Sequence, residues 1–250
     1  MPVAFVTGGA SGIGRSIVER LARDGFAIAI ADIDVDGAGT LAGKVESEAI
    51  GVRCDVTSID EVKAAAETVA GALGPVDVLV NNAGYDRPGF FLQGDPASWQ
   101  HLLDVTLNGV LNCTYVLAPP IAARAAETGY GRIVNIASDA GRVGSMGEAV
   151  YSAAKGGAIA FTKSMARELA RNGVTVNAVC PGPAETPMTD LIRTTEIGEK
   201  FMQRMVQATP LRRLAQPEEV AALVSYFTSE DARFTTGQVV SVSGGLTMSG

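Results

Sequence analysis

The chain has 250 residues, of which 47% are hydrophobic, and this is enough apolar material to bury the core of one large domain. A formal charge of −7 opposes electrostatic binding to nucleic acid or to an anionic membrane. The cysteines lack metal-site spacing, no apolar run of about 18 residues occurs, and the first strand-like run starts at residue 3, so we expect a cytoplasmic protein without a metal site.

Short apolar segments rich in β-branched residues alternate with longer helical patterns along the chain. The predicted strands cover 3–7, 27–31, 51–55, 76–80, 132–137, 174–179 and 238–243, and the predicted helices cover 13–24, 58–73, 97–125, 149–172 and 217–228. Near-continuous hydrophobicity indicates strands that are covered on both faces, and strand–helix alternation indicates right-handed parallel crossovers. We therefore predict a single-domain (1–250), doubly wound α/β fold with a seven-stranded parallel sheet.

Two segments depart from this regular pattern. Pro119 and Pro120 lie inside the third predicted helix and predict a kink there. Residues 183–215 form an insertion after the sixth strand that contains a Met-rich amphipathic stretch. Ligands bind at the carboxyl end of such sheets, so we expect a small helical lid over a substrate, with an ordinary packing helix as the alternative.

A glycine-rich turn follows the first predicted strand. In "TGGASGIG", Gly8, Gly12 and Gly14 lie between that strand and the next helix. This context suits a tight turn, close approach of backbone N–H groups to a pyrophosphate, and a helix N-terminus that faces the anion. The segment predicts a Rossmann-type dinucleotide site.

Asp32 closes the second predicted strand, 18 residues after Gly14. A carboxylate here accepts hydrogen bonds from the adenosine ribose hydroxyls and repels a 2′-phosphate. Neither Ser11 nor Ile33 supplies a cation to offset that repulsion. The predicted cofactor is therefore NAD(H) rather than NADP(H); the alternative is that Asp32 only caps the next helix.

Tyr151 lies four positions before Lys155 in "YSAAK". On a helix this spacing puts both side chains on one face, which permits a proton donor beside a cation. The pair alone is a weak signal, because two residues on an amphipathic helix surface give the same pattern. Its meaning depends on the neighbouring motifs.

Several ordered motifs resemble those of the short-chain dehydrogenase/reductase family over the whole chain. They are "TGGASGIG", "NNAG" at 81–84, Ser138 thirteen residues before Tyr151, the Tyr-x-x-x-Lys pair, "PGPAET" at 181–186 and "TGQVVSVSGG". The resemblance implies an NAD-dependent enzyme that transfers hydride between a secondary alcohol and a ketone. It also implies a homotetramer, because two long helices resemble those of the family's subunit interfaces.

The resemblance also assigns residues to the site. Ser138, Tyr151 and Lys155 become the catalytic group, and Thr106 joins it because it aligns with a family asparagine; Asn108, two residues on, faces elsewhere. The implied cofactor-binding residues are Gly8, Ser11, Gly12, Ile13, Gly14, Asp32, Ile33, Cys54, Asp55, Val56, Asn82, Ala83, Gly84, Tyr151, Lys155, Pro181, Gly182, Ala184 and Thr186.

The expected mechanism assigns one task to each catalytic side chain. Tyr151 moves the hydroxyl proton, and because an ordinary tyrosine pKa of about 10 makes a poor base, Lys155 and the charge of NAD⁺ are expected to lower that pKa. Ser138 donates a hydrogen bond to the substrate oxygen. His101 is the single histidine and is predicted to lie away from these motifs, so a histidine-based hydrolase triad is not expected.

Within the family, "ASDAGRVGSMGEAVYSAAKGG", "VCPGPAET" and the ending "SVSGGLTMSG" resemble the 2-hydroxycyclohexanecarboxyl-CoA dehydrogenases most. This implies a cyclic hydroxyacyl-CoA substrate. Arg142, between Ser138 and Tyr151, is predicted to meet an anionic or thioester substrate, with a solvated arginine as the equal alternative. Further arginines considered for a CoA phosphate are Arg87, Arg193 and Arg204.

Three other functions stay open. A 3-oxoacyl thioester reductase fits the same motifs, although such enzymes usually prefer NADPH and Asp32 disfavours it. A small diol or cyclic alcohol dehydrogenase is a second alternative of the same class. A dinucleotide sensor without turnover is the remote alternative, because such proteins tend to lose the tyrosine or the lysine and this chain has both.

Overall fold

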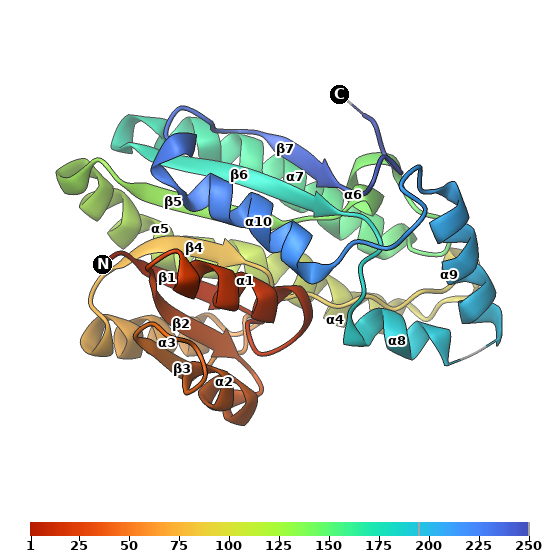
Figure 1. The fold of residues 1–250 in the computed structure, drawn as a ribbon, viewed down its shortest axis with the longest axis horizontal. Helices are drawn as coiled ribbons and strands as arrows, with labels where there is room; N and C mark the ends of the chain where they lie inside the picture. Colours follow the sequence, from red (N-terminus) through yellow and green to blue (C-terminus); the bar gives the residue numbers. More distant parts are fainter. Residues whose placement is uncertain (195, 250) are drawn as a thin grey trace.

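The computed structural model describes residues 1–194 and 196–249 and contains a seven-stranded, all-parallel sheet with the order β3-β2-β1-β4-β5-β6-β7. Figure 1 shows the sheet between two layers of helices. The predicted doubly wound fold is confirmed. The strands are β1 (Val3–Thr7), β2 (Ala27–Asp32), β3 (Ala49–Arg53), β4 (Val76–Asn81), β5 (Gly131–Ile136), β6 (Val174–Pro181) and β7 (Val239–Val242).

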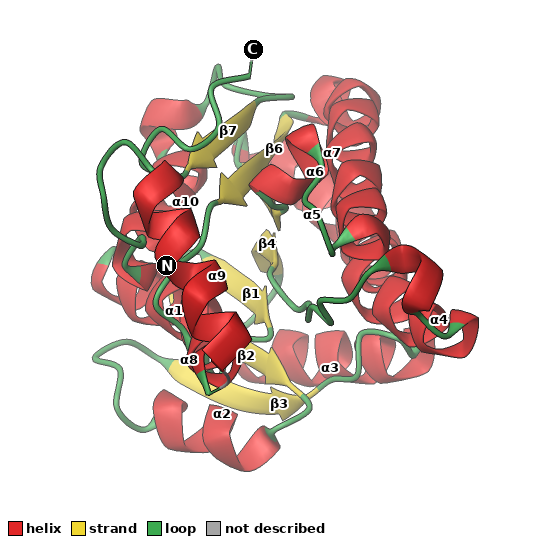
Figure 2. Ribbon diagram, turned by 90° about the vertical axis from the view of Figure 1, so that its right-hand side faces the viewer, coloured by secondary structure: helices red, strands yellow, loops and turns green. Residues whose placement is uncertain are grey.

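Each face of the sheet buries a separate apolar cluster. Helices α1 (Gly12–Arg23), α2 (Val35–Ala42) and α10 (Pro217–Thr228) pack on one face, and α3 (Ile59–Ala72), α5 (Gly109–Thr128) and α7 (Ala149–Leu169) pack on the other (Figure 2). The central strands β1, β4 and β5 are buried along their whole length. This double burial explains why their sequences are continuously apolar rather than alternating.

The third strand lies two residues earlier than predicted. Ala49 and Ile50 pair with Ile28 and Ala29 of β2, which extends the strand toward the N-terminus. The strand ends at Arg53 because Asp55 begins a turn, in which its side chain accepts hydrogen bonds from both the backbone N–H and the hydroxyl of Thr57. Helix α2, which precedes this strand, was not predicted.

The predicted single helix 97–125 is wrong. The structure has α4 (Pro96–Leu103), a π-helical turn (Asp104–Asn108) and then α5. In the π-turn the N–H of Gly109 bonds to the carbonyl of Asp104, five residues back. A Cβ on Gly109 would lie 2.6 Å from Val56 Cγ2, so the turn brings the backbone close to the β3–α3 connection. Helix α5 continues through both prolines.

The carboxyl ends of the strands face a group of short elements. These are α6 (Asp139–Val143), α8 (Pro187–Arg193) and α9 (Glu196–Ala208), of which α8 and α9 fall inside the predicted 183–215 insertion (Figure 1, right). Helix α6 was not predicted. Within the described part of the chain, every helix is too short or too polar to cross a bilayer.

Candidate active site

A cleft of about 850 Å³ opens at the carboxyl edge of the sheet. Every cofactor-binding residue predicted above lines it, together with Ser138. Two predicted site residues, Thr106 and Arg142, are not among the lining residues. The fold therefore brings together segments from the ends of β1, β2, β4, β5 and β6, at the position where ligands bind in open parallel sheets.

The glycine turn is held by backbone geometry that side chains would disrupt. Gly8 and Gly12 have φ values of +62° and +52°, and a Cβ on Gly14 would lie 2.0 Å from the carbonyl oxygen of Gly8. Asn82 secures the turn, because its Nδ2 donates to the carbonyls of Thr7 at 3.0 Å and Gly8 at 2.9 Å. The motif thus joins the ends of β1 and β4.

The start of α1 is open to an anion. Ser11, the residue before the helix, makes no side-chain capping bond, and the first turn carries no acidic residue. The N-terminal N–H groups and the helix dipole therefore remain available to a negatively charged group. A cradle of this kind fits the pyrophosphate of a nicotinamide dinucleotide.

Asp32 lies at the end of β2 and is fixed in place by two backbone groups. Its Oδ2 accepts from the N–H of Ala10 at 2.9 Å, and its Oδ1 accepts from the N–H of Asp34 at 3.0 Å. Helix α2 is capped by Asp34, whose side chain accepts from Gly37, so the alternative role of Asp32 as the helix cap is wrong. The carboxylate keeps lone pairs free toward the cleft.

The predicted catalytic group comes from two neighbouring elements, α6 and α7. Ser138 follows β5 and begins α6, where its Oγ accepts from the N–H of Ala140 at 3.1 Å and its hydroxyl also bonds to Tyr151. Lys155 is 3% exposed and donates from Nζ to the carbonyl of Ile136 at 2.7 Å. Its Nζ lies 5.7 Å from the ring centroid of Tyr151, so one helical turn of α7 presents both groups to the cleft.

The pKa of Tyr151 is raised in this structure, whereas the expected mechanism lowers it. Burial lowers the pKa of Lys155 from 10.5 to about 8. Burial first, and then the Asp86 carboxylate, hold the pKa of Tyr151 well above its ordinary value, although the bond to Ser138 lowers it. In the cofactor-free protein Tyr151 is therefore a neutral phenol, because desolvation and nearby carboxylates outweigh the effect of the hydrogen bond with Ser138.

Thr106 and His101 lie on consecutive elements, the π-helical turn and α4. Thr106 is fully buried in the π-helical turn, and its Oγ1 donates to the carbonyl of Tyr85 at 3.2 Å, so it supports the wall of the cleft from behind. The prediction that His101 lies away from the motifs is wrong, because this residue lines the cleft. Its ring lies 5.3 Å from that of Tyr85.

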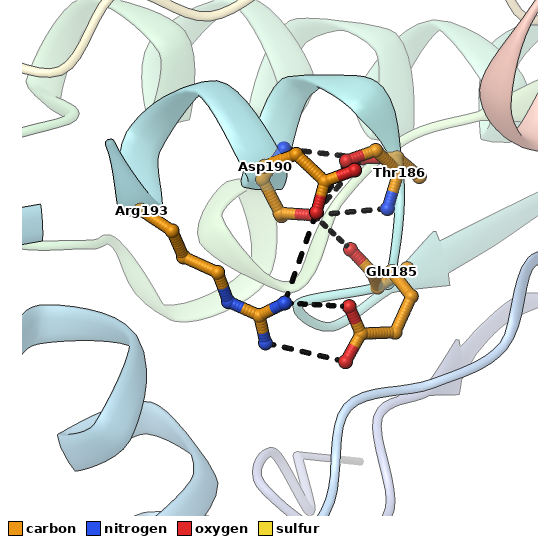
Figure 3. Close-up of polar contacts among 6 residues, drawn as sticks. Glu185, Thr186, Asp190 and Arg193 are labelled. Atoms are coloured by element: carbon orange, nitrogen blue, oxygen red, sulfur yellow. Dashed lines mark hydrogen bonds and ion pairs between the residues drawn. The ribbon is translucent and has the colours of Figure 1, made fainter. Parts of the chain in front are cut away.

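The predicted anion-binding arginines have other partners or positions. Arg142 Nη1 donates to Ser241 Oγ at 2.8 Å, and its Nη2 donates to the carbonyl of Ser249. Arg193 forms a bidentate ion pair with Glu185, with N–O distances of 2.8 and 3.2 Å. Its Nη1 lies 3.8 Å from Asp190 Oδ1 (Figure 3). The structure thus places these guanidinium groups in protein contacts, and Arg87 and Arg204 are exposed outside the cleft lining.

Several residues that sequence reasoning missed also line the cleft. Asp86 and Glu148 line it beside the catalytic group, and the apolar part of α9 contributes Phe201, Met202 and Met205. Their positions in the sequence could have identified the two acids as site residues. Asp86 comes two residues after "NNAG", and Glu148 comes three residues before Tyr151. The pairing of these two acids could not be deduced, because it depends on how two distant loops meet.

The fold and the cleft fit an oxidoreductase that binds a nicotinamide dinucleotide. Residues 8–247 match the family described as enoyl-(acyl carrier protein) reductase. The chain is 41% identical to a putative ketoacyl reductase of Streptomyces coelicolor, covering 98% of this chain and 96% of the relative. It is 38% identical to an acetoacetyl-CoA reductase of Shinella zoogloeoides, covering 97% of both.

A solved structure agrees with these relatives. The crystal structure of a single-residue variant of actinorhodin polyketide ketoreductase with NADPH superposes with a TM-score of 0.90 at 39% identity, covering 98% of this chain and 97% of that one. The chain belongs to the short-chain dehydrogenase/reductase family and is an enzyme of that oxidoreductase class. These relatives are keto-group reductases, and none of them is a 2-hydroxycyclohexanecarboxyl-CoA dehydrogenase.

Proposed function

We propose that this enzyme interconverts a 3-oxoacyl thioester and its 3-hydroxy form, using NAD(H). The observation that carries the proposal is the placement of Ser138, Tyr151 and Lys155 together at the inner wall of a cleft whose other end carries the dinucleotide cradle. The names of the relatives favour the 3-oxoacyl thioester over the cyclic hydroxyacyl-CoA. The guanidinium of Arg142 forms hydrogen bonds within the protein, and this also weakens the hypothesis of a cyclic hydroxyacyl-CoA substrate.

The residues of the chain can carry out ketone reduction as follows. The bound nicotinamide dinucleotide supplies or accepts the hydride. Ser138 donates a hydrogen bond to the ketone oxygen and orients it toward Tyr151. Tyr151, kept as a neutral phenol in the cofactor-free protein, gives its proton to that oxygen as negative charge develops there. Lys155 then faces the tyrosinate and stabilises its charge.

The preference for NAD(H) rests on Asp32 and on the shortage of cations in the cleft. Lys155 is the only lysine or arginine among the described residues that line it. Arg53, the residue paired with Asp32 across β2 and β3, bonds to the carbonyl of Ile33 at 3.3 Å and lies 3.5 Å from Glu61. A 2′-phosphate beside Asp32 would therefore meet a fixed carboxylate without a compensating charge.

The test is steady-state reduction of acetoacetyl-CoA by the purified protein with NADH or NADPH. We expect kcat/KM to favour NADH by at least tenfold, and Asp32→Ala to reduce that preference. Asp36→Ala, which removes an exposed carboxylate of α2, is the matched control and should keep it. A wild-type preference for NADPH would overturn the cofactor assignment, and turnover of 2-hydroxycyclohexanecarboxyl-CoA with acetoacetyl-CoA inert would overturn the substrate class.

A homotetramer remains a prediction. Helices α5 and α7 lie in the outer layer of the same sheet face, and Tyr115 on α5 is 72% exposed. An exposed aromatic side chain on a long helix is consistent with a subunit contact. Light scattering coupled to size exclusion would give a mass four times the 25.8 kDa of one chain if this prediction holds.

A further inference from the structure

Two carboxyl groups face one another at the substrate end of the cleft. Asp86 follows β4, Glu148 precedes α7, and their side chains form a hydrogen bond with each other. Glu148 occupies the N-cap position of α7 but makes no capping bond with its side chain. The carboxyl group of Glu148 thus pairs with Asp86 instead of satisfying the helix end. The described residues provide no third acidic, histidine or cysteine side chain to complete a metal site with them.

Backbone contacts hold the two acids in place. The N–H of Gly89 donates to the carbonyl of Gly147 at 2.7 Å, which ties the loop after β4 to the loop before α7. Asp86 Oδ1 accepts from the N–H of Arg87 at 2.7 Å. The pair is therefore held by two loops that are tied together and that both line the cleft.

The charge distribution of the cleft gives this pair a consequence for substrates. The acidic lining residues are Asp32, Asp55, Asp86, Asp139 and Glu148, whereas Lys155 is the only lysine or arginine among the described lining residues. Asp86 and Glu148 are the acids whose charge acts directly on Tyr151. A second negative charge attached within a few atoms of the reacting carbon would approach this pair in a partly desolvated site.

We propose that the Asp86–Glu148 pair sets the charge specificity of the enzyme, so that a 3-oxoacyl group is accepted as an uncharged thioester or ester and rejected as the free 3-oxo acid. This inference rests on the proposed function and names the form of the acyl group that the site takes. It implies that the reaction that supplies the substrate is one that has already converted the carboxylate into a thioester.

The rejection of acids depends on pH in a defined direction. Burial, and then the neighbouring Glu148, raise the pKa of Asp86 from 3.8 to about 7. The other groups that face this residue are Tyr151 and Lys155 from α7, and His101 from α4 packs against the adjacent Tyr85. Asp86 is therefore mostly protonated at pH 6 and mostly ionised at pH 8, so the negative charge at this end of the cleft increases between the two pH values. Discrimination against a carboxylate should therefore increase from pH 6 to pH 8.

The experiment compares acetoacetyl-N-acetylcysteamine with acetoacetate, which share the reacting ketone and differ in charge. The quantity measured is the ratio of kcat/KM for the thioester to kcat/KM for the acid, with NADH, at pH 6 and pH 8. In the wild type we expect this ratio to rise at least fivefold between the two pH values. In Glu148→Gln and Asp86→Asn the ratio at pH 8 should fall at least tenfold and lose its pH dependence.

Controls separate this role from packing and from other titrations. Glu67→Gln removes an exposed carboxylate of α3 and should keep the wild-type ratio at both pH values. If His101 caused the pH dependence, Glu148→Gln would retain it. Equal losses on both substrates would assign the pair a structural role and overturn the inference.

Failure of the proposed function gives a different result. In that case neither ketone is reduced. The charge specificity of the Asp86–Glu148 pair can still be tested by calorimetry, which measures binding of acetoacetate and of ethyl acetoacetate to the wild type and to Glu148→Gln. Binding of the ester alone by the wild type, and of both compounds by the variant, would support the inference. Equal binding of both compounds by the wild type would contradict it.

Discussion

The cofactor half and the substrate half of the cleft are built in different ways. In the cofactor half, the backbone determines the shape. Gly8 and Gly12 have positive φ values, Gly14 lies close to the carbonyl of Gly8, and the side-chain amide of Asn82 donates hydrogen bonds to the turn. In the substrate half, side chains from separate loops meet, as Asp86 and Glu148 do. Under the proposed function, the first half binds a cofactor common to many enzymes, and the second half selects the carbonyl compound.

Lys155 belongs to both halves, and removing its charge gives the largest expected effect. We expect Lys155→Met to lower kcat by about 10³-fold, a loss in the range of general acid–base catalysis, because the ammonium that faces the tyrosinate is removed. The same substitution should stabilise the cofactor-free protein. The buried ammonium has its pKa lowered from 10.5 to about 8, which corresponds to about 3 kcal/mol, and the lost bond to Ile136 offsets about 1–2 kcal/mol of this.

The sign of this stability effect can be checked by its pH dependence. Between pH 8 and 10.5 the unfolded chain keeps the lysine proton while the folded chain loses it, so stability from this group rises with pH in that window. Lys155→Met should not show this rise in stability with pH. Denaturant unfolding should therefore show the variant to be more stable at pH 7, with the difference shrinking toward pH 10.5. A variant less stable than the wild type at pH 7 would contradict the assignment.

The cofactor half was predictable because its determinants are adjacent in the sequence. The strand, the glycine turn and the following helix occupy consecutive residues, and each carries its own signal. Asp32 was identified in the same way, as the last residue of a strand. Even here β3 was misplaced, because its pairing with β2 and the turn at Asp55 decide its ends and hydrophobicity alone does not.

The substrate half was only partly predictable, because its determinants are tertiary. Ser138, Tyr151 and Lys155 were found through a family spacing, and the structure places all of them along the cleft. The π-helical turn that buries Thr106 has no signal in hydrophobic periodicity, which continues through it. The partner of Arg142 lies at the C-terminal end of the chain, and no local pattern identifies such a contact.

Gly14→Ala tests the claim that backbone geometry governs the cofactor half. The added Cβ would meet the carbonyl oxygen of Gly8 at 2.0 Å and Asn82 Nδ2 at 2.5 Å, and the first of these is backbone that cannot turn away. We expect NADH affinity to fall at least 100-fold and the free energy of unfolding to fall by about 3 kcal/mol. Fluorescence titration and denaturant unfolding measure the two quantities.

The matched control is Gly71→Ala in α3. A Cβ there meets nothing within 4 Å, so the substitution should stabilise the helix by about 0.5–1 kcal/mol and leave NADH affinity as in the wild type. If Gly14→Ala behaved like this control, the close approach would have no functional meaning, and the contrast between the two halves would fail.

The smallest expected effect concerns Arg142, for which sequence and structure give opposite expectations. As a contact for a CoA substrate, it should matter only for substrates that carry CoA. As the structure places it, the guanidinium ties β7 to the C-terminal segment through Ser241 and Ser249, and Leu246 and Thr247 of that segment line the cleft. Arg142→Ala should then loosen this wall and raise KM about three- to tenfold for every ketone.

Acetoacetyl-CoA and acetoacetyl-N-acetylcysteamine separate these two roles, because they share the acyl group and only the first carries phosphates. Equal increases in KM, with kcat and NADH affinity kept, would establish Arg142 as a positioning residue for the C-terminal segment. Arg142→Lys should recover part of the loss, because an ammonium can reach one of the two acceptors but not both in the same geometry. An increase confined to the CoA thioester would instead show that the guanidinium leaves Ser249 to meet the substrate.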